Sequence, residues 1–227
     1  MSNPIRIGIA GLGTVGAGLI KIIQKNSNIL EARAGKPIKI IAVSALSKSK
    51  DRGVDLTAYE WEDDPIALAK RDDIDVFVEL IGGESGQAKK ATEEAIKHGK
   101  HVVTANKAML AIHGQELASA AENSGVNLRF EAAVAGGIPV IKTLTESLAG
   151  NNITRIMGVM NGTCNYILTR MEDTGLAYEE IFEEANQLGF LEADPNLDVG
   201  GIDAAHKLVL LSSIAYGTEV DFNGAIL

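Results

Sequence analysis

IRIGIAGLGTVGAGLIKIIQK, residues 5–25, places a glycine-rich turn between an apolar run and a second run with apolar residues at helical spacing. Residues 5–10 predict a buried strand, and the residues after the turn predict a helix with one buried face. Gly11, Gly13 and Gly16 supply Gly-x-Gly-x-x-Gly where the strand passes into the helix. That context is typical of a dinucleotide-binding turn, whereas the same glycines in an unrelated loop would carry no such meaning.

Each glycine of the turn meets a separate physical demand. Gly11 allows the tight turn, Gly13 lets the backbone approach a pyrophosphate, and Gly16 lets the helix pack close to the strand. The first backbone N–H groups of the helix would face the phosphates. We therefore expect a dinucleotide cofactor bound by the turn residues Gly11, Leu12, Gly13, Thr14, Val15 and Gly16.

The second predicted strand, residues 38–43, bears on which dinucleotide is bound. An Asp or Glu at the end of this strand usually holds the ribose 2′-hydroxyl of NAD. Here the strand runs instead into SALSKSKDR, residues 44–52, with no acid at its end. Lys48, Lys50 and Arg52 could meet a 2′-phosphate, or they could form an ordinary basic surface loop. The missing acid predicts a preference for NADP over NAD.

Composition limits the classes of partner. The chain has 227 residues and a mass of 24.0 kDa, and 21 basic against 30 acidic residues give a formal charge of −9. That charge argues against nucleic acid or an anionic membrane surface and favours a small-molecule substrate. The N-terminus has no signal-like pattern, and the apolar runs are too short to span a membrane. One cysteine, Cys164, fits a reducing compartment, so we expect a soluble cytoplasmic protein.

Predicted strands and helices alternate beyond residue 70 as in βαβ units. This order predicts the α/β class with a doubly wound parallel sheet of the Rossmann type. Ligands bind beyond the carboxyl ends of such strands, so Gly82, Thr104 and Lys107 should line the cofactor cleft. Lys107 could pair with a phosphate, polarise a substrate oxygen or simply be solvated. Strands are expected at 75–81, 101–104 and 126–133, and helices at 86–98 and 109–123.

A second domain is expected after a hinge with the sequence GGIP, residues 136–139. The predicted domains are 1–135, which binds the dinucleotide, and 136–227, which binds the substrate. The second domain should hold a strand at 153–159 and helices near 163–171 and 178–188.

The stretch GFLEADPNLDVGGIDAAHK, residues 189–207, carries acidic residues and a lysine around a turn and on the helix that follows. A proline and two glycines should break any helix between residues 192 and 202, which places Glu192 on a loop. Asp203 and Lys207, four residues apart, share one face of the next predicted helix. Taken alone, such a pair is most simply a solvated ion pair of little energetic value.

Five blocks, in order along nearly the whole chain, resemble the N-terminal portion of a homoserine dehydrogenase: GIAGLGTVGAGL, VVTANKAML, FEAAVAGGIPVI, MGVMNGTCNYILTRM and NQLGFLEADPNLDVGGIDAAHKLVLL. The first is shared by many dehydrogenases, and the last two are specific to this family. The resemblance implies interconversion of L-homoserine and L-aspartate 4-semialdehyde by hydride transfer with NADP or NAD, on the route to threonine and methionine.

The resemblance also implies catalytic and substrate-binding roles by position. Lys207 matches the family's catalytic lysine, Asp203 its acidic neighbour near the substrate, and Lys107 a lysine between cofactor and substrate. Glu192 matches the carboxylate that holds the substrate's ammonium group, and Asp198 a further acid near the substrate. A lysine suits this chemistry, because hydride transfer to an aldehyde leaves an alkoxide that needs a proton or a positive charge.

Two further kinds of site follow from the same resemblance. Gly189 matches a position near the nicotinamide. A monovalent cation, Na⁺ or K⁺, would take oxygen ligands, mostly from the backbone, at Glu131, Val134, Gly136 and Ile138.

The chain is shorter than the members of the family that it resembles. Its tail, residues 221–227, ends on apolar residues just after a turn, where a new element would be expected to start. We therefore expect a fragment whose second domain is a partial α+β domain with an unpaired edge or an exposed apolar face. Formation of a homodimer through that region is expected.

Two other functions fit parts of the sequence. Asn161-Gly162-Thr163-Cys164-Asn165 is similar to the cysteine loop of aldehyde dehydrogenases, in which a thiolate at a helix start attacks the aldehyde. A cysteine in this position can equally be a small buried filler. The second alternative is a dinucleotide-binding fragment without catalysis, which the shortness of the chain favours.

Overall fold

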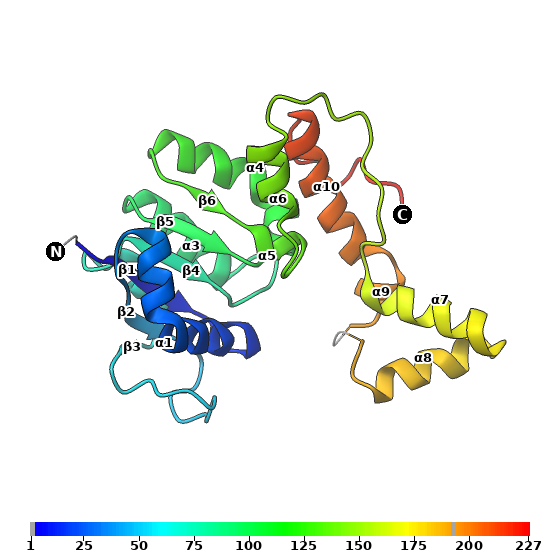
Figure 1. Cartoon of the computed structure of the whole chain (residues 1–227), viewed down its shortest axis with the longest axis horizontal. Coiled ribbons are helices and arrows are strands. Elements are labelled where there is room, and N and C mark those ends of the chain that lie inside the picture. Colours follow the sequence, from blue (N-terminus) through cyan, green and yellow to red (C-terminus); the bar gives the residue numbers. More distant parts are fainter. Residues whose placement is uncertain (1–2, 192–193) are drawn as a thin grey trace. The chain divides into compact units, whose positions relative to one another are not determined.

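The computed structural model describes residues 3–191 and 194–227, which divide into two compact units at the bond between Val140 and Ile141 (Figure 1). Each unit has its own packed elements and is described by itself. No helix among the described residues combines the length and the apolar character that crossing a membrane requires.

The first unit is built on a six-stranded parallel sheet with the order β3-β2-β1-β4-β5-β6. The chain moves outward from β1 in one direction, then returns to the other side of β1 with β4. This reversal creates a crevice at the carboxyl ends of β1 and β4, where such sheets bind ligands. The strands are β1 (Ile5–Ala10), β2 (Ile38–Ser44), β3 (Glu60–Glu62), β4 (Val76–Glu79), β5 (His101–Thr104) and β6 (Leu128–Arg129).

Helices connect these strands, and the doubly wound parallel sheet predicted from the sequence is confirmed. The helices are α1 (Thr14–Ala34), α2 (Pro65–Lys70), α3 (Gln87–Lys97), α4 (Lys107–Asn123) and α5 (Glu131–Val134). A core of Ile9, Ile20 and Val43, all fully buried, joins β1, α1 and β2. Burying side chains of this size contributes roughly 1.5–3 kcal/mol each.

Several predicted boundaries in this unit differ from the structure, and the strand expected at 75–81 is β4, which spans only Val76–Glu79. The helix expected from residue 109 begins at Lys107, because the side chain of Asn106 accepts a hydrogen bond from the Met109 N–H and caps the helix there. The strand expected over 126–133 is wrong beyond Arg129. Only two residues of β6 pair with β5, and the alanine-rich segment after them turns into α5.

Backbone packed against backbone fixes the passage from β1 to α1. Gly11 has φ +96°, and a Cβ at this position would lie 2.2 Å from the carbonyl oxygen of Leu80. A Cβ on Gly16 would lie 2.1 Å from the carbonyl oxygen of Gly11. Only glycine allows both approaches, so α1 can start directly above the strand that precedes it.

The described residues of the second unit form helices and loops. After α6 (Val140–Lys142) come a π-helical turn η1 (Thr143–Ser147), α7 (Gly162–Thr174), α8 (Tyr178–Gln187), α9 (Asn196–Val199) and α10 (Ile202–Tyr216). Helices α7 and α8 pack together around Ile167, Ile181 and Ala185, which are buried. Arg170 on α7 and Glu184 on α8 form an ion pair across the same contact.

The strand predicted at 153–159 is wrong. The segment has no regular structure, and the side chains of Met157 and Val159 are each 77% exposed. A strand needs a neighbour that takes up its backbone N–H and C=O groups. The described residues of the second unit contain no other strand, so the apolar pattern of this segment has no sheet to join.

Replacing Gly16 by alanine should destabilise the first unit by about 1–3 kcal/mol, because its Cβ would collide with the carbonyl of Gly11. Gly18 provides a matched control two residues along α1, where a Cβ would meet no atom within 4 Å. Gly18→Ala should stabilise the helix by about 0.5–1 kcal/mol. Urea unfolding of both variants measures the difference, and equal free energies of unfolding would contradict the packing argument.

Candidate active site

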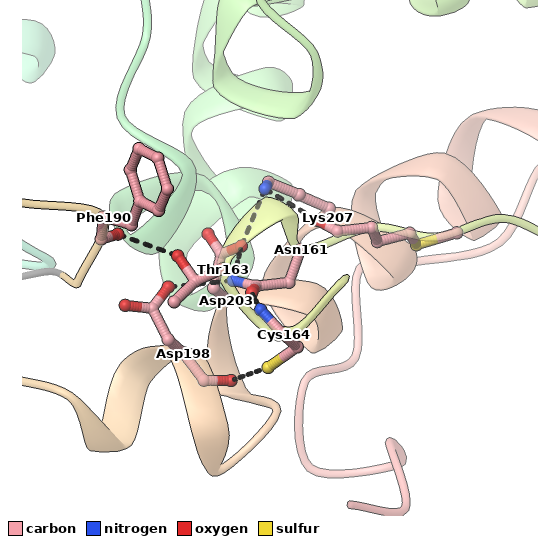
Figure 2. Close-up of polar contacts among 8 residues, drawn as sticks. Asn161, Thr163, Cys164, Phe190, Asp198, Asp203 and Lys207 are labelled. Atoms are coloured by element: carbon pink, nitrogen blue, oxygen red, sulfur yellow. Dashed lines mark hydrogen bonds and ion pairs between the residues drawn. The ribbon is translucent and has the colours of Figure 1, made fainter. Parts of the chain in front are cut away.

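Lys207 lies on α10 with its ammonium group held by two acceptors (Figure 2). Its Nζ lies 2.7 Å from Oδ2 of Asp203, one turn earlier, and 2.8 Å from the carbonyl oxygen of Met160. The side chain of Asp203 is 3% exposed and that of Lys207 is 21% exposed. The pair is therefore not the solvated surface ion pair that the sequence left open. Charges this far from water need partners, and each of these two has the other.

Asn161 joins the carboxylates of Asp203 and Asp198 (Figure 2). Its amide nitrogen donates to Oδ2 of Asp203 at 3.0 Å and to Oδ1 of Asp198 at 2.9 Å. Its amide oxygen accepts from the Cys164 N–H at 2.8 Å, which makes Asn161 the N-cap of α7. One side chain thus starts a helix and holds two like charges close together. Sequence reasoning did not select Asn161, although its place before a predicted helix start is the signal of a cap.

Asp198 is 3% exposed and lies on α9. The expectation that no helix would form between residues 192 and 202 is therefore wrong for 196–199. Pro195 stands at the N-cap of this single turn, where its missing N–H costs nothing. Gly200 ends the turn, since a Cβ there would lie 2.5 Å from the carbonyl oxygen of Asn196. Glu192, the expected ligand of the substrate's ammonium group, lies outside the described residues.

Cys164 lies on α7 beside the same carboxylates. Its Sγ donates to the backbone oxygen of Asp198 at 3.3 Å. Burial raises the pKa of this thiol above its ordinary value, and the negative charges of Asp198 and Asp203 raise it further. A nucleophilic cysteine needs a lowered pKa, so this environment disfavours the thiolate that an aldehyde dehydrogenase would use. A pocket of about 270 Å³ opens beside the cluster, lined among others by Asn161, Cys164 and Asp198.

The glycine-rich turn of the first unit has room for a ligand. A Cβ on Gly13 would meet no atom within 4 Å, in contrast to Gly11 and Gly16. Gly13 is the N-cap of α1, and no side chain of the described residues caps this helix end. The first N–H groups of α1, at Thr14 and Val15, therefore lack the side-chain acceptor that many helices provide. Such an end suits an anionic phosphate, so the turn fits the predicted dinucleotide.

Arg52 is held against this turn by backbone carbonyls. Its guanidinium donates to the carbonyl oxygens of Leu12 at 3.0 Å, Ser47 at 2.5 Å and Lys50 at 2.7 Å. It also lies 5.7 Å from the ring centre of Trp61. A guanidinium carries five N–H donors, and these contacts use three of them. The structure thus brings Arg52 to the dinucleotide turn, whereas Lys48 lies on the exposed part of the same loop.

The remaining expected cofactor residues lie at three places. Gly82 follows β4 with φ +86°, and Thr104 ends β5 with a side chain that is 1% exposed. Lys107 is the first residue of α4. Gly189 belongs to the second unit and follows Leu188, the C-cap of α8, with φ +74°.

The positions expected to hold a cation lie along one stretch at the end of the first unit. Glu131 begins α5 and Val134 ends it, with Gly136 and Ile138 in the loop that follows. The carbonyl oxygen of Glu131 accepts from Ala135, and that of Ile138 accepts from Val140. A carbonyl oxygen carries two lone pairs, so one hydrogen bond does not by itself prevent it from binding a cation.

Two family models match the chain. Residues 11–131 match the model described as "Homoserine dehydrogenase, NAD binding domain", and residues 139–225 match the model described as "Homoserine dehydrogenase". Among curated proteins, the homoserine dehydrogenase of Neisseria gonorrhoeae is 46% identical over 99% of this chain and 51% of that protein. The Pseudomonas aeruginosa homoserine dehydrogenase is 45% identical over 98% of this chain and 51% of that protein.

Solved structures with the same name superimpose on this chain. The homoserine dehydrogenase of Thiobacillus denitrificans gives a TM-score of 0.92 at 43% identity and covers 97% of this chain and 51% of its own. A hyperthermophilic archaeal homoserine dehydrogenase in complex with NADPH gives a TM-score of 0.82 at 29% identity. This match covers 95% of this chain and 71% of the archaeal chain. The chain spans about half the length of the curated relatives it matches. On these matches, the chain belongs to the homoserine dehydrogenase family of NAD(P)-dependent oxidoreductases.

Proposed function

We propose that this chain carries the cofactor turn and the proton-handling lysine of an enzyme that interconverts L-homoserine and L-aspartate 4-semialdehyde. The observation that carries the proposal is the position of Lys207, which is 21% exposed, between the buried carboxylate of Asp203 and the carbonyl of Met160. Such an arrangement costs stability unless it serves another purpose, because an isolated buried charge pair is seldom worth its desolvation. Membership of the homoserine dehydrogenase family supports the proposed substrate and reaction.

The cofactor would be held by the glycine-rich turn and the N-terminus of α1, and the nicotinamide, when bound, supplies or accepts the hydride. We propose NADP as the preferred form. Arg52 supports this preference, since it lies beside the turn with two guanidinium donors beyond the three used by Leu12, Ser47 and Lys50. Lys48 is the second proposed contact to a 2′-phosphate.

Lys207 would transfer the proton of the reaction. Its ammonium group has three N–H donors, and among the described residues Asp203 and the carbonyl of Met160 accept two of them. The third can reach the oxygen of the substrate. In the reducing direction Nζ gives a proton to the aldehyde oxygen as hydride arrives at the carbon, and in the oxidising direction neutral Nζ takes the hydroxyl proton. Asp203 and the carbonyl of Met160 orient the lysine in both directions of the reaction.

Asp198 and Glu192 are proposed to bind the ammonium group of the substrate. The support for Asp198 is its burial beside Asp203 and its fixed orientation on Asn161. The support for Glu192 is the family resemblance of its sequence block alone. A carboxylate matched to a substrate cation also gives specificity, since a substrate without the amine would leave the acid without its partner.

Three further roles remain proposals. Lys107, at the start of α4, is proposed as a cation on the cofactor side of the reaction. The oxygens of Glu131, Val134, Gly136 and Ile138 are proposed to bind Na⁺ or K⁺. A homodimer is proposed to form through the second unit, where Met157 and Val159 are largely exposed.

Replacing Lys207 by alanine should lower turnover by about 10²–10⁴-fold and leave the Kd for NADPH within about twofold of wild type, because it removes the proton donor and none of the cofactor turn. Lys25→Ala, an exposed lysine on α1, is the control and should change neither quantity. The assay follows homoserine oxidation in this chain and in a version extended past Leu227 to the length of the relatives.

Near-normal turnover of the Lys207→Ala variant would refute the catalytic role of the lysine. Cofactor binding without hydride transfer in both chain lengths would favour the alternative of a non-catalytic dinucleotide-binding chain. Retained hydride transfer by the wild-type chain would exclude that alternative.

Arg52→Ala distinguishes between the two uses of this arginine. If the guanidinium binds the 2′-phosphate, NADPH should bind about ten times more weakly, whereas NADH affinity should change little. If Arg52 only supports the turn through Leu12, both affinities should fall together and their ratio should stay the same. Fluorescence titration with each cofactor measures the ratio, and equal wild-type affinities for both would reject the preference for NADP.

Cys164→Ser should keep turnover within about twofold of wild type, because serine can make the same hydrogen bond to the backbone of Asp198. The raised pKa of the thiol also predicts slow alkylation by iodoacetamide at pH 7.5, with a rate that rises through a midpoint above the value of about 8.5 for a free cysteine. Loss of activity in the serine variant, or rapid alkylation at neutral pH, would support the thiol-dependent aldehyde dehydrogenase instead.

A further inference from the structure

Glu79 is a fully buried acid at the end of β4. Its Oε1 accepts from the backbone N–H groups of Ile81 at 2.7 Å and Gly82 at 3.1 Å. Its Oε2 accepts from the hydroxyl of Thr104 at 2.5 Å. Ile81 and Gly82 lie in the segment that leaves β4, and Thr104 is the last residue of β5. The carboxylate therefore fixes two neighbouring exits of the sheet at once.

The hydrogen bonds continue from Thr104 to the start of α4. Thr104 Oγ1 accepts from the backbone N–H of Asn106 at 2.9 Å. The side chain of Asn106 donates to the carbonyl of Gly83 at 2.7 Å and caps α4 through Met109 at 3.1 Å. The direction of each bond is consistent, because a hydroxyl that accepts from Asn106 has one hydrogen left to donate to Glu79.

The exit of β4 also supports the dinucleotide turn. The ideal Cβ of Gly11 would lie 2.2 Å from the carbonyl oxygen of Leu80 and 2.6 Å from the nitrogen of Ile81. The Leu80–Ile81 peptide is therefore in close contact with the turn, and Glu79 holds the N–H of that peptide. The segments after β1, β4 and β5 are thus connected through one carboxylate.

Stability alone gives little reason for an acid at this position. An apolar side chain of similar size would avoid the cost of removing a carboxylate from water. The directed hydrogen bonds supply something an apolar side chain lacks, since they define where the Gly82–Gly83 backbone and the start of α4 lie. Gly82 has φ +86° and Gly83 has φ +88°, so this loop has a specific backbone shape that must be maintained.

We propose that Glu79 is a positioning residue for the nicotinamide cofactor, acting through Thr104 and the Gly82–Gly83 loop to hold the cofactor-binding segments in register. The inference rests on the proposed function, since it assumes that these segments bind NAD(P). It assigns Glu79 no contact with the cofactor itself.

The test uses Glu79→Gln in this chain, with NADPH fluorescence as the probe of binding. Glutamine keeps the volume but presents an NH₂ group either to the backbone donors of Ile81 and Gly82 or to the hydroxyl of Thr104. We expect the Kd for NADPH, measured well below the melting temperature of the variant, to rise about tenfold. Leu68→Ala is the control for lost stability, because it empties a fully buried site on α2, where Leu68 lies beside Gly8 in the middle of β1.

The control separates positioning from general stability. Leu68→Ala should lower the melting temperature at least as much as Glu79→Gln and leave the Kd within about twofold of wild type. A Kd for Glu79→Gln no higher than that of Leu68→Ala would overturn the inference. A wild-type chain that bound neither NADPH nor NADH would instead overturn the proposed function, and the inference with it.

A double-mutant cycle tests the route through Thr104. Thr104→Val removes the hydroxyl that connects Glu79 to Asn106 while nearly conserving volume. If Glu79 acts through this hydroxyl, the Kd of the double variant for NADPH should be about equal to that of the single variant with the higher Kd. Fold-losses that simply multiply would show independent effects and overturn the proposed route.

Discussion

Contact of backbone with backbone at the glycine-rich turn is the constraint on which the first unit depends. A Cβ on Gly11 would collide with the peptide that leaves β4, and a Cβ on Gly16 would collide with Gly11 itself. The start of α1 and the crevice beside β4 therefore follow from the absence of two side chains. Gly13 shows the complementary case, because the space beside it is open and faces a helix end without a side-chain cap. The same short stretch thus lets α1 pack closely against the strands and leaves space for an anion at the helix N-terminus.

The second unit depends on hydrogen bonds among buried charges. Oδ2 of Asp203 accepts from both Lys207 and Asn161, and the segment 160–161 contributes a carbonyl to the lysine as well. The amide of a helix cap thereby holds two carboxylates, and one of these carboxylates holds the ammonium group. Removing one partner would break hydrogen bonds of at least one other member, so each member helps to fix the positions of the others. Rigid placement is what a proton-transfer group requires, since a small displacement from the reacting oxygen lowers the rate steeply.

The sequence predicted most of the first unit because its signals are local. Glycines at fixed spacing, an apolar run and helical periodicity all lie within residues 5–25, and the order of strands follows from their alternation with helices. It failed where the outcome depends on distant partners. Residues 153–159 have the pattern of a strand, but pairing needs a second strand that the described residues of their unit lack. Asp203 and Lys207 were found by spacing, whereas their burial depends on Asn161, 42 residues before Asp203.

Glu79 and Asp203 are buried acids that each fix the position of other groups. Glu79 sets two strand exits, and Asp203 sets the position of a lysine. Each acid accepts hydrogen bonds from its own set of donors. If stability were the only requirement, an apolar side chain could replace either acid with little loss, or even a gain, in the free energy of unfolding. Neither acid stands out in the sequence by composition, because a lone Glu after a strand or a lone Asp on a helix is most often solvated. Burial together with directed hydrogen bonds distinguishes them, because these bonds fix the geometry of the groups around each acid.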